Sequence, residues 1–314
     1  MKKKKKIITV VGPTATGKTD VAIALAKRLN GELISADSMQ IYQEMQIGTA
    51  KPTQAELGDI PCHMIDFVAP DQRFSVANFK EQATDWIRDI ISRGKEPILV
   101  GGTGLYINAM TLPWILEDVP VNQDARQRFY KEIEFIDNEE LYQRLKKIDP
   151  TAAAGVHPNN RKRVMRALEI FEMTGKTKTQ LDQEAAKQTL PYDYLMIGLR
   201  FPREELYRRI GERVDKMVAA GLLEEITDLR SKGYHKDLLS MQAIGYKEFF
   251  PYLEGEETLE ECIRVLKRDT RHFAKRQLTW FRKDDRIHWF EPLTYDHQET
   301  MIDDMMDLID ESNR

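Results

Sequence analysis

Cysteine is scarce in this sequence of 314 residues, which contains only Cys62 and Cys262. Two cysteines are too few for a framework of several disulfides or for a zinc site of four cysteines, so we expect a reducing compartment, the cytoplasm. Cys62 is followed by His63, but no second cluster of cysteine and histidine stands nearby. This favours ordinary packing of the pair, with a possible short strand at residues 63–67, over a metal site.

Long apolar runs are also missing. No stretch approaches the roughly 20 apolar residues that a membrane-spanning helix needs. The lysines at positions 2–6 precede an apolar run, but that run ends at Gly12 and is too short for a signal peptide. We therefore interpret the start of the chain as a flexible basic arm and expect no membrane partner.

An excess of positive charge is absent as well. The formal net charge is −4, from 47 basic and 51 acidic residues. Attraction of the whole surface to nucleic acid is thereby excluded, so any such binding must come from local basic patches. The length and the 41% of hydrophobic residues suit a globular protein with one large domain or two smaller ones.

A phosphate-binding pattern stands near the start of the chain. A β-branched run at residues 7–11 predicts a buried strand, and the sequence GPTATGKT at 12–19 fits G-x-x-x-x-G-K-[ST]. Glycines let backbone N–H groups curve around an anion, and the helix that begins at Gly17 adds its positive dipole end. We expect Lys18 to neutralise a phosphate and Thr19 to offer its hydroxyl to Mg²⁺. The candidate phosphate-binding residues are Gly12, Pro13, Thr14, Ala15, Thr16, Gly17, Lys18 and Thr19.

Two further strands are predicted to end beside this loop. One, near residues 32–36, leads to Asp37, and another, at 97–100, leads to the glycine-rich turn that contains Thr103. Because the carboxyl ends of parallel strands line the ligand crevice, we expect Asp37 and Thr103 to face the phosphate loop. Many nucleotide hydrolases carry a metal-binding acid at the end of such a strand. Glycines occupy that place here, so Asp37 is the carboxylate expected nearest the phosphates.

The alternation of strand and helix stops between residues 116 and 190. Helical patterns at 124–136, 138–148 and 161–174 predict an all-helical insertion with a small core of its own. We therefore expect a catalytic core formed by residues 1–115 and 191–314, with the insertion between them.

Basic residues gather at two places in the predicted helices. Arg161, Lys162, Arg163 and Arg166 cluster where a helix begins, an end that disfavours cations, so the cluster is either a solvated face or serves an external anion. The helix predicted at 258–283 carries a stripe of positive charge, with Trp280 and Phe281 beside its end. Basic residues mixed with aromatics suit RNA phosphates and unstacked bases, although a solvated face is the alternative. The stripe comprises Arg264, Arg268, Arg271 and Lys275.

Several sequence blocks now form a recognisable set. They are GPTATGKT at 12–19, ISADSMQIY at 34–42, VGGTGLY at 100–106, HPNNRKRVMRALE at 157–169 and AKRQLTWFR at 274–282. Together they resemble the tRNA dimethylallyltransferases, also called tRNA isopentenyltransferases, over nearly the whole chain. The resemblance implies an α/β fold with a P-loop NTPase-like parallel sheet flanked by helices. It also implies transfer of a dimethylallyl group from dimethylallyl diphosphate to N6 of adenosine 37 in the tRNA anticodon loop, with Mg²⁺ and release of diphosphate. The zinc extension of some eukaryotic members is absent, which suggests a bacterial type.

The resemblance also implies roles for individual residues. Asp37 would be the catalytic base, Thr103 would lie beside the substrates, and Arg213 would bind the leaving diphosphate. The implied tRNA-binding residues are Asp37, Ser38, Met39, Gln40, Thr103, Lys162, Arg163, Val164, Met165, Arg166, Asp237, Gln242, Lys275, Arg276, Gln277, Thr279, Trp280 and Arg282. It leaves open whether Arg126 or Arg128 touches RNA. We expect a monomer whose partners are the anticodon stem-loop and dimethylallyl diphosphate.

Two other functions remain open from the residues alone. A phosphate loop with a helical lid also suits a small-molecule or nucleotide kinase, which would bind ATP, or a nucleotide-binding regulatory switch. The glycines at 101 and 102 weaken both alternatives because they replace a metal-binding acid. A kinase of small substrates also has no need of two basic blocks.

Overall fold

The computed structural model describes residues 4–113 and 123–313. It divides into two units, one formed by residues 1–110 with 191–314 and the other by Thr111–Leu190. No helix in the described ranges is both long and apolar enough to cross a membrane.

The first unit is built on a six-stranded sheet in the order β3-β2-β4-β1-β5-β6, and every pairing is parallel. The parallel α/β sheet predicted from the sequence is therefore confirmed. The strands are β1 (Lys6–Val11), β2 (Gly31–Ser35), β3 (Cys62–His63), β4 (Glu96–Gly101), β5 (Asp193–Leu199) and β6 (Ile287–Phe290). The strand expected at 63–67 is wrong beyond His63, because Met64 and Asp66 adopt left-handed conformations with φ of 63° and 58°.

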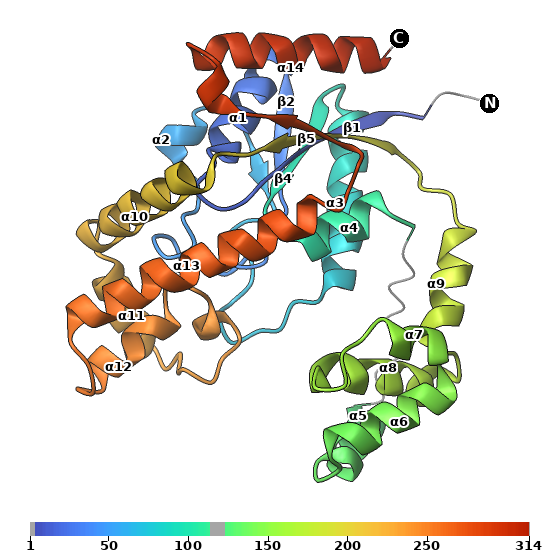
Figure 1. Cartoon of the computed structure of the whole chain (residues 1–314). Helices are drawn as coiled ribbons and strands as arrows, with labels where there is room; N and C mark the ends of the chain where they lie inside the picture. The colour runs from blue at the N-terminus through green and yellow to red at the C-terminus, as the bar shows by residue number, and fades with distance from the viewer. Residues whose placement is uncertain (1–3, 114–122, 314) are drawn as a thin grey trace. The chain divides into compact units, whose positions relative to one another are not determined.

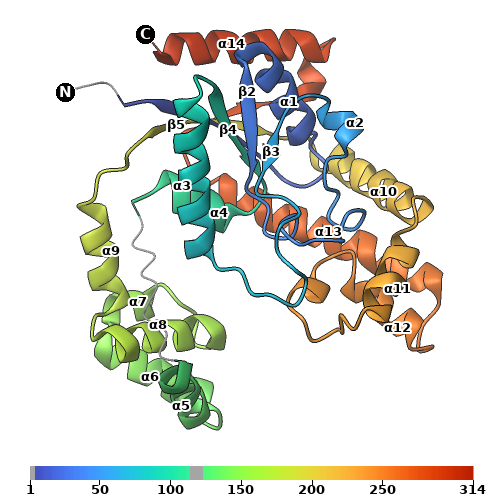
Figure 2. The ribbon, with the colours of Figure 1, turned by 180° about the vertical axis from the view of Figure 1, so that it is seen from behind.

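Helices cover both faces of the sheet (Figure 1 and, from behind, Figure 2). On one face, α1 (Lys18–Leu29) and α14 (Gln298–Asn313) pack against alternate strand residues such as Ile8 and Val10. On the other face, α3 (Val76–Ser92) and α4 (Gly104–Thr111) pack against Ile7 and Val11. Successive residues of a strand point to opposite faces of the sheet. Because helices cover both faces here, every residue of a central strand is buried, which explains the continuous apolar run of β1.

A third core lies among the helices that follow β5. These are α10 (Arg203–Ala219), α11 (Leu222–Ser231), α12 (Phe250–Leu253) and α13 (Leu259–Phe281). The side chain of Thr258 caps α13 by accepting a hydrogen bond from the Glu261 amide. At its other end α13 reaches the sheet, where Phe281 joins the core beneath α3. Short elements complete the unit: α2 (Gln54–Leu57) and single 3₁₀ turns at Ser240–Gln242, Lys247–Phe249 and Pro292–Thr294.

The second unit is entirely helical in its described residues. It contains α5 (Gln123–Ile133), α6 (Asn138–Ile148), α7 (Pro150–Ala154), α8 (Arg161–Thr174) and α9 (Lys178–Ala186), with a core of its own around Leu141, Leu145 and Val164. The helix expected at 124–136 ends at Ile133. The Arg161 guanidinium donates hydrogen bonds to the carbonyl groups of Ile133, Glu134 and Ile136. These bonds take the place of the backbone hydrogen bonds that a longer helix would make.

The buried ring of Phe79 offers a test of this packing. It is fully buried and stacks on Tyr106 of α4 with ring centroids 4.0 Å apart. Phe79→Ala should lower the free energy of unfolding by about 3–5 kcal/mol, because it removes buried contacts and leaves a cavity. Urea denaturation measures this change. Gln82→Ala, an exposed position on the same helix, is the matched control and should change stability by less than about 0.5 kcal/mol.

Candidate active site

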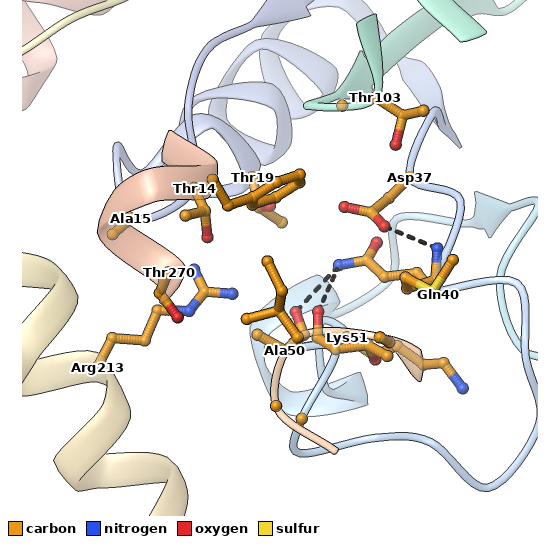
Figure 3. A pocket seen from close by; sticks show the side chains of 18 of the residues that line it. Thr14, Ala15, Thr19, Asp37, Gln40, Ala50, Lys51, Thr103, Arg213 and Thr270 are labelled. Atoms are coloured by element: carbon orange, nitrogen blue, oxygen red, sulfur yellow. Dashed lines mark hydrogen bonds between the residues drawn. The ribbon is translucent and has the colours of Figure 1, made fainter. Parts of the chain in front are cut away.

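A cavity of about 630 Å³ lies in the first unit, at the carboxyl edge of the sheet. Its walls come from the phosphate loop, the segments after β2 and β4, residues 48–52, and parts of α10 and α13. Figure 3 shows Asp37 and Arg213 entering it from opposite sides, with Thr14 and Thr19 between them. The cavity thus joins residues that are far apart in the chain.

The phosphate loop is held in shape from within and from outside. The Thr16 hydroxyl donates to the Pro13 carbonyl at 2.8 Å, and the Arg209 guanidinium of α10 donates to the Ala15 carbonyl at 2.9 Å. Gly17 has a φ of 78° and begins α1 without any side-chain cap. The first amides of α1 therefore remain available to an anion, which the helix dipole also favours.

Asp37 and Thr103 lie together in the wall opposite the loop. The Ser38 amide donates to the Thr103 hydroxyl at 3.0 Å, and the Thr103 amide donates to the Ala36 carbonyl at 3.2 Å. A Cβ on Gly101 would lie 2.2 Å from the Ala36 carbonyl oxygen, so the two strand ends can approach this closely only because glycine stands there. One carboxylate oxygen of Asp37 accepts from the Met39 amide at 2.9 Å, which fixes the orientation of the carboxylate.

The charges around the cavity favour an anionic ligand. Burial lowers the pKa of Lys18 to about 8, against the opposing pull of the Asp37 carboxylate. Burial likewise lowers the pKa of Arg213, which Asp37 and Asp20 partly offset. Basic side chains outnumber acidic ones in the cavity wall, and a bound anion would raise the pKa of Lys18 again. The basic residues are Lys18, Lys51, Arg213, Lys247 and Arg276, and the acidic residues are Asp20, Asp37 and Glu56.

Gln40 is held by a loop that sequence reasoning missed. The Ser35 hydroxyl donates to the Gln40 amide oxygen at 3.0 Å, and the Gln40 amide nitrogen donates to the carbonyl groups of Thr49 and Ala50. Lys51, whose side chain is 2% exposed, anchors the same loop through Asp66 at 2.6 Å. Nothing in the sequence of residues 48–51 resembles a motif, so only the folded chain reveals their place in the cavity wall.

Glu225 was also missed, although it organises that loop from α11. Its carboxylate accepts hydrogen bonds from the backbone amides of Gln46, Ile47 and Gly48 at 2.7–3.1 Å. The Tyr246 hydroxyl donates to the same carboxylate at 2.7 Å. A single glutamate in an amphipathic helix carries no signal of such a role.

The metal expected at Thr19 would find few protein ligands. Within residues 4–113 and 123–313, no group of three or more His, Cys, Asp or Glu side chains could hold a metal ion. The Thr19 hydroxyl and the Asp37 carboxylate line the same cavity. Such a sparse set of oxygen donors fits Mg²⁺, which keeps several waters and binds mainly through substrate phosphates.

Two groups stand out among the basic residues of α13. Arg264 and Arg268, predicted as part of the stripe, pair with Glu261 and Asp269 at 2.6 and 2.8 Å. The second group lies at the other end of the helix and consists of the exposed residues Lys275, Arg276 and Arg282. No described acidic side chain lies within ion-pair distance of any of these three residues. Of the others, Lys267 pairs with Asp215 at 2.6 Å, and Arg271 of the predicted stripe lies over the Tyr207 ring.

Other predicted tRNA-binding residues of the first unit are partly or fully accessible, with one exception. Thr279 and Trp280 are exposed, as is Asp237, and Gln242 lines the cavity together with Ser38 and Met39. Gln277 is the exception. It is 7% exposed and both ends of its side chain bond to backbone, although it still borders the cavity, so its contact with tRNA stays a prediction.

The basic cluster of the second unit is only partly available. Lys162 and Arg163 are exposed, whereas Met165 packs against the core of the unit. Val164 is completely buried in that core, so its side chain is not exposed to a ligand, and its contact with tRNA stays a prediction. Burial follows from helical spacing, because Val164 shares a face of α8 with Ala167 and Leu168.

Arg166 and Arg126 both neutralise a buried carboxylate in this unit. They pair with Glu169, whose side chain is 3% exposed, at 3.0 and 2.7 Å. Arg128 instead donates to the Asp124 carbonyl of its own helix and stays exposed. Arg128 is therefore more available than Arg126 for an external ligand.

Fold and cavity define an α/β protein with a phosphate loop, in which a carboxylate and two partly buried cations line one cavity. Residues 40–284 match the family model described as IPP transferase. The chain is 49% identical over 306 residues to the tRNA dimethylallyltransferase of Alkaliphilus oremlandii, covering 96% of each chain. The chain therefore belongs to the IPP transferase family, whose members named here are tRNA dimethylallyltransferases, and it is an enzyme of the prenyltransferase class.

Solved structures agree with this assignment. The tRNA delta(2)-isopentenylpyrophosphate transferase of Staphylococcus epidermidis matches with a TM-score of 0.73 and 42% identity, covering 98% of this chain and 100% of that chain. A eukaryotic dimethylallyltransferase described as acting on tRNA matches with a TM-score of 0.79 and 34% identity, covering 91% and 74%. The family resemblance and the fold class predicted from the sequence are confirmed.

The lowered pKa of Lys18 predicts how anion binding depends on pH. The free protein should bind inorganic diphosphate less tightly as pH rises above 8, because Lys18 loses the proton that attracts the anion. Above pH 8, the ratio of the diphosphate affinity of the wild type to that of Lys18→Met should fall by up to about tenfold per pH unit, as expected when binding requires one proton. Calorimetric titration between pH 7 and 10 measures both proteins.

The comparison with Lys18→Met removes the titration of diphosphate itself, which is common to both proteins. Lys18→Arg is the second control, since arginine stays protonated throughout this range. Equal pH dependence in the wild type and Lys18→Met would show that Lys18 does not hold the anion.

Proposed function

We propose that this enzyme transfers a dimethylallyl group from dimethylallyl diphosphate to N6 of adenosine 37 in the tRNA anticodon loop, releasing diphosphate. The observation that carries the proposal is that Asp37, Lys18 and Arg213 line one cavity, with Arg213 opposite the Asp37 carboxylate. The transfer needs this combination, because it creates negative charge on one reactant and removes a proton from the other.

The chemistry can be assigned to the residues of the cavity. The exocyclic nitrogen of adenine is a weak nucleophile because its lone pair is delocalised into the ring. As the bond from N6 to the allylic carbon forms, the bond from that carbon to the diphosphate oxygen breaks, and Asp37 accepts the N6 proton. Lys18, Arg213 and the amides at the start of α1 stabilise the charge on the departing diphosphate.

Mg²⁺ completes the proposal for the diphosphate site. The hydroxyl of Thr19 would hold it, and when bound it would supply positive charge at the diphosphate oxygens. Thr16 and Arg209 act separately, because they keep the loop in the shape that receives the anion.

The nucleic-acid partner is the tRNA anticodon stem-loop. Lys275, Arg276 and Arg282 supply exposed positive charge on α13, and Trp280, 38% exposed, supplies an aromatic surface beside them. Within the second unit, Lys162 and Arg163 form another exposed basic pair. An adenine stacked in the loop must leave its neighbours to reach Asp37, and Thr103 lies next to Asp37 to receive it. We take the active form to be a monomer.

Replacing the base tests the chemical step. Asp37→Asn keeps the shape of the side chain but cannot accept the N6 proton, so single-turnover dimethylallyl transfer should fall by about 10²–10⁴-fold. Both substrates should still bind, with affinities within a few-fold of the wild type. Quenched-flow assays with radiolabelled dimethylallyl diphosphate measure the rate, and mass spectrometry of the digested tRNA identifies the product.

The same assay separates the transferase from a kinase. The wild type should not hydrolyse ATP or transfer its phosphoryl group above background. Asp71→Asn, the same change at an exposed residue that does not line the cavity, is the control for Asp37→Asn. ATP turnover without alkylation of tRNA would refute the proposal and favour a kinase.

The exposed end of α13 predicts a salt effect. Lys275→Glu with Arg276→Glu should reduce the slope of log affinity for tRNA against log salt concentration by about 1–2, because two phosphate contacts are lost. Fluorescence anisotropy with a labelled anticodon stem-loop measures the slope. Arg264→Glu with Arg268→Glu is a matched control on the same helix, since both arginines already pair with acids. Equal slopes for the two double variants would place Lys275 and Arg276 outside the RNA interface.

A further inference from the structure

Gln277 connects two loops that the chemistry uses but that come from different strands. Its side-chain oxygen accepts a hydrogen bond from the Thr14 amide at 2.9 Å, and its nitrogen donates to the Gly102 carbonyl at 2.9 Å. Thr14 belongs to the phosphate loop after β1, and Gly102 belongs to the turn after β4 that carries Thr103. One buried amide therefore sets the distance between the diphosphate site and the wall of Asp37 and Thr103.

The side chain of glutamine suits this bridge. Thr14 offers a donor and Gly102 an acceptor, so the bridging side chain must accept at one end and donate at the other, as an amide does. Glutamate could accept from Thr14 but could not donate to Gly102 when ionised. Asparagine is one methylene shorter and cannot span the same gap from α13.

The glycine-rich turn is shaped to receive α13. A Cβ on Gly102 would lie 2.4 Å from the Gln277 side-chain nitrogen, and a Cβ on Gly104 would lie 2.4 Å from the Trp280 indole. Gln277 and Trp280 are three residues apart and so lie on the same side of the helix. These glycines let α13 rest directly on the turn, which leaves little freedom between the helix and the two loops.

The same helical turns carry the exposed charges assigned above to tRNA. Lys275, Arg276, Thr279 and Arg282 are exposed, while Gln277 between them is buried. We propose that Gln277 is a positioning residue that couples tRNA binding on α13 to diphosphate binding in the phosphate loop, through its hydrogen bonds to Thr14 and Gly102. This inference rests on the proposed function, since it requires tRNA on α13 and diphosphate in the loop.

Coupling of this kind has a measurable signature. The affinity for inorganic diphosphate should rise by at least about fivefold when the anticodon stem-loop is bound; this ratio is the coupling factor. Bound diphosphate must raise the affinity for the stem-loop by the same factor. Gln277→Met keeps the length of the side chain but removes its hydrogen bonds, so the coupling factor should fall to near one. Gln277→Glu should lose part of the coupling, because the hydrogen bond from the Thr14 amide can remain while the one to Gly102 is lost. Calorimetric titration of diphosphate with and without saturating RNA measures the factor.

Two further variants keep the test specific. Gly102→Ala should lower the coupling from the opposite side of the bridge, because the added Cβ displaces the Gln277 amide. His272→Ala, an exposed change on the same helix, should leave the coupling unchanged. Each variant is compared with the wild type by thermal unfolding, and a change in stability common to all variants cannot produce a selective loss of coupling.

The outcomes separate this inference from the proposed function. If the wild type transfers dimethylallyl groups to tRNA but its coupling is unchanged in Gln277→Met, the role of Gln277 is refuted and the function stands. If the wild type binds both ligands without any coupling, the inference is likewise refuted. If no transfer to tRNA occurs at all, the proposed function fails and the inference fails with it.

Discussion

The active site of the first unit depends on partly buried charges that are gathered in one cavity. Burial lowers the pKa of both Lys18 and Arg213, and the nearby carboxylates, Asp37 foremost, oppose only part of that effect. Such an arrangement is costly in the free protein and favourable once an anion is present. The loop geometry, the helix dipole and the cavity walls together keep these charged groups in place.

Long-range hydrogen bonds maintain that arrangement. Arg209 holds the phosphate loop from α10, Glu225 holds residues 46–48 from α11, and Gln277 holds both Thr14 and Gly102 from α13. Each of these side chains comes from the part of the chain that follows the helical insertion. The phosphate loop near the start of the chain thus depends for its shape on helices more than 190 residues away. The segment after the insertion therefore shapes the phosphate loop in addition to supplying β5 and β6 to the sheet.

Two residues predicted to contact RNA are buried for the same physical reason. Val164 and Gln277 lie within basic sequence blocks, and a block of sequence says nothing about which side of a helix each member occupies. Val164 faces the core of the second unit, and Gln277 faces the loops beneath α13. Similarly, Arg264 and Arg268 belong to a continuous stripe in the sequence, yet acidic neighbours neutralise them and leave the free charge at the far end of α13.

Sequence alone determined the phosphate loop, the parallel sheet and the strand ends at Asp37 and Thr103, because each depends on local patterns. The glycine spacing of the loop, the apolar runs of buried strands and the rule that parallel strands end at one edge require no knowledge of distant contacts. Tertiary structure alone decided the burial of Gln277, the anchoring of Gln40 by residues 49 and 50, and the control of that loop by Glu225. These features join residues from separate elements, and only the packing of the whole chain brings their donors and acceptors within bonding distance.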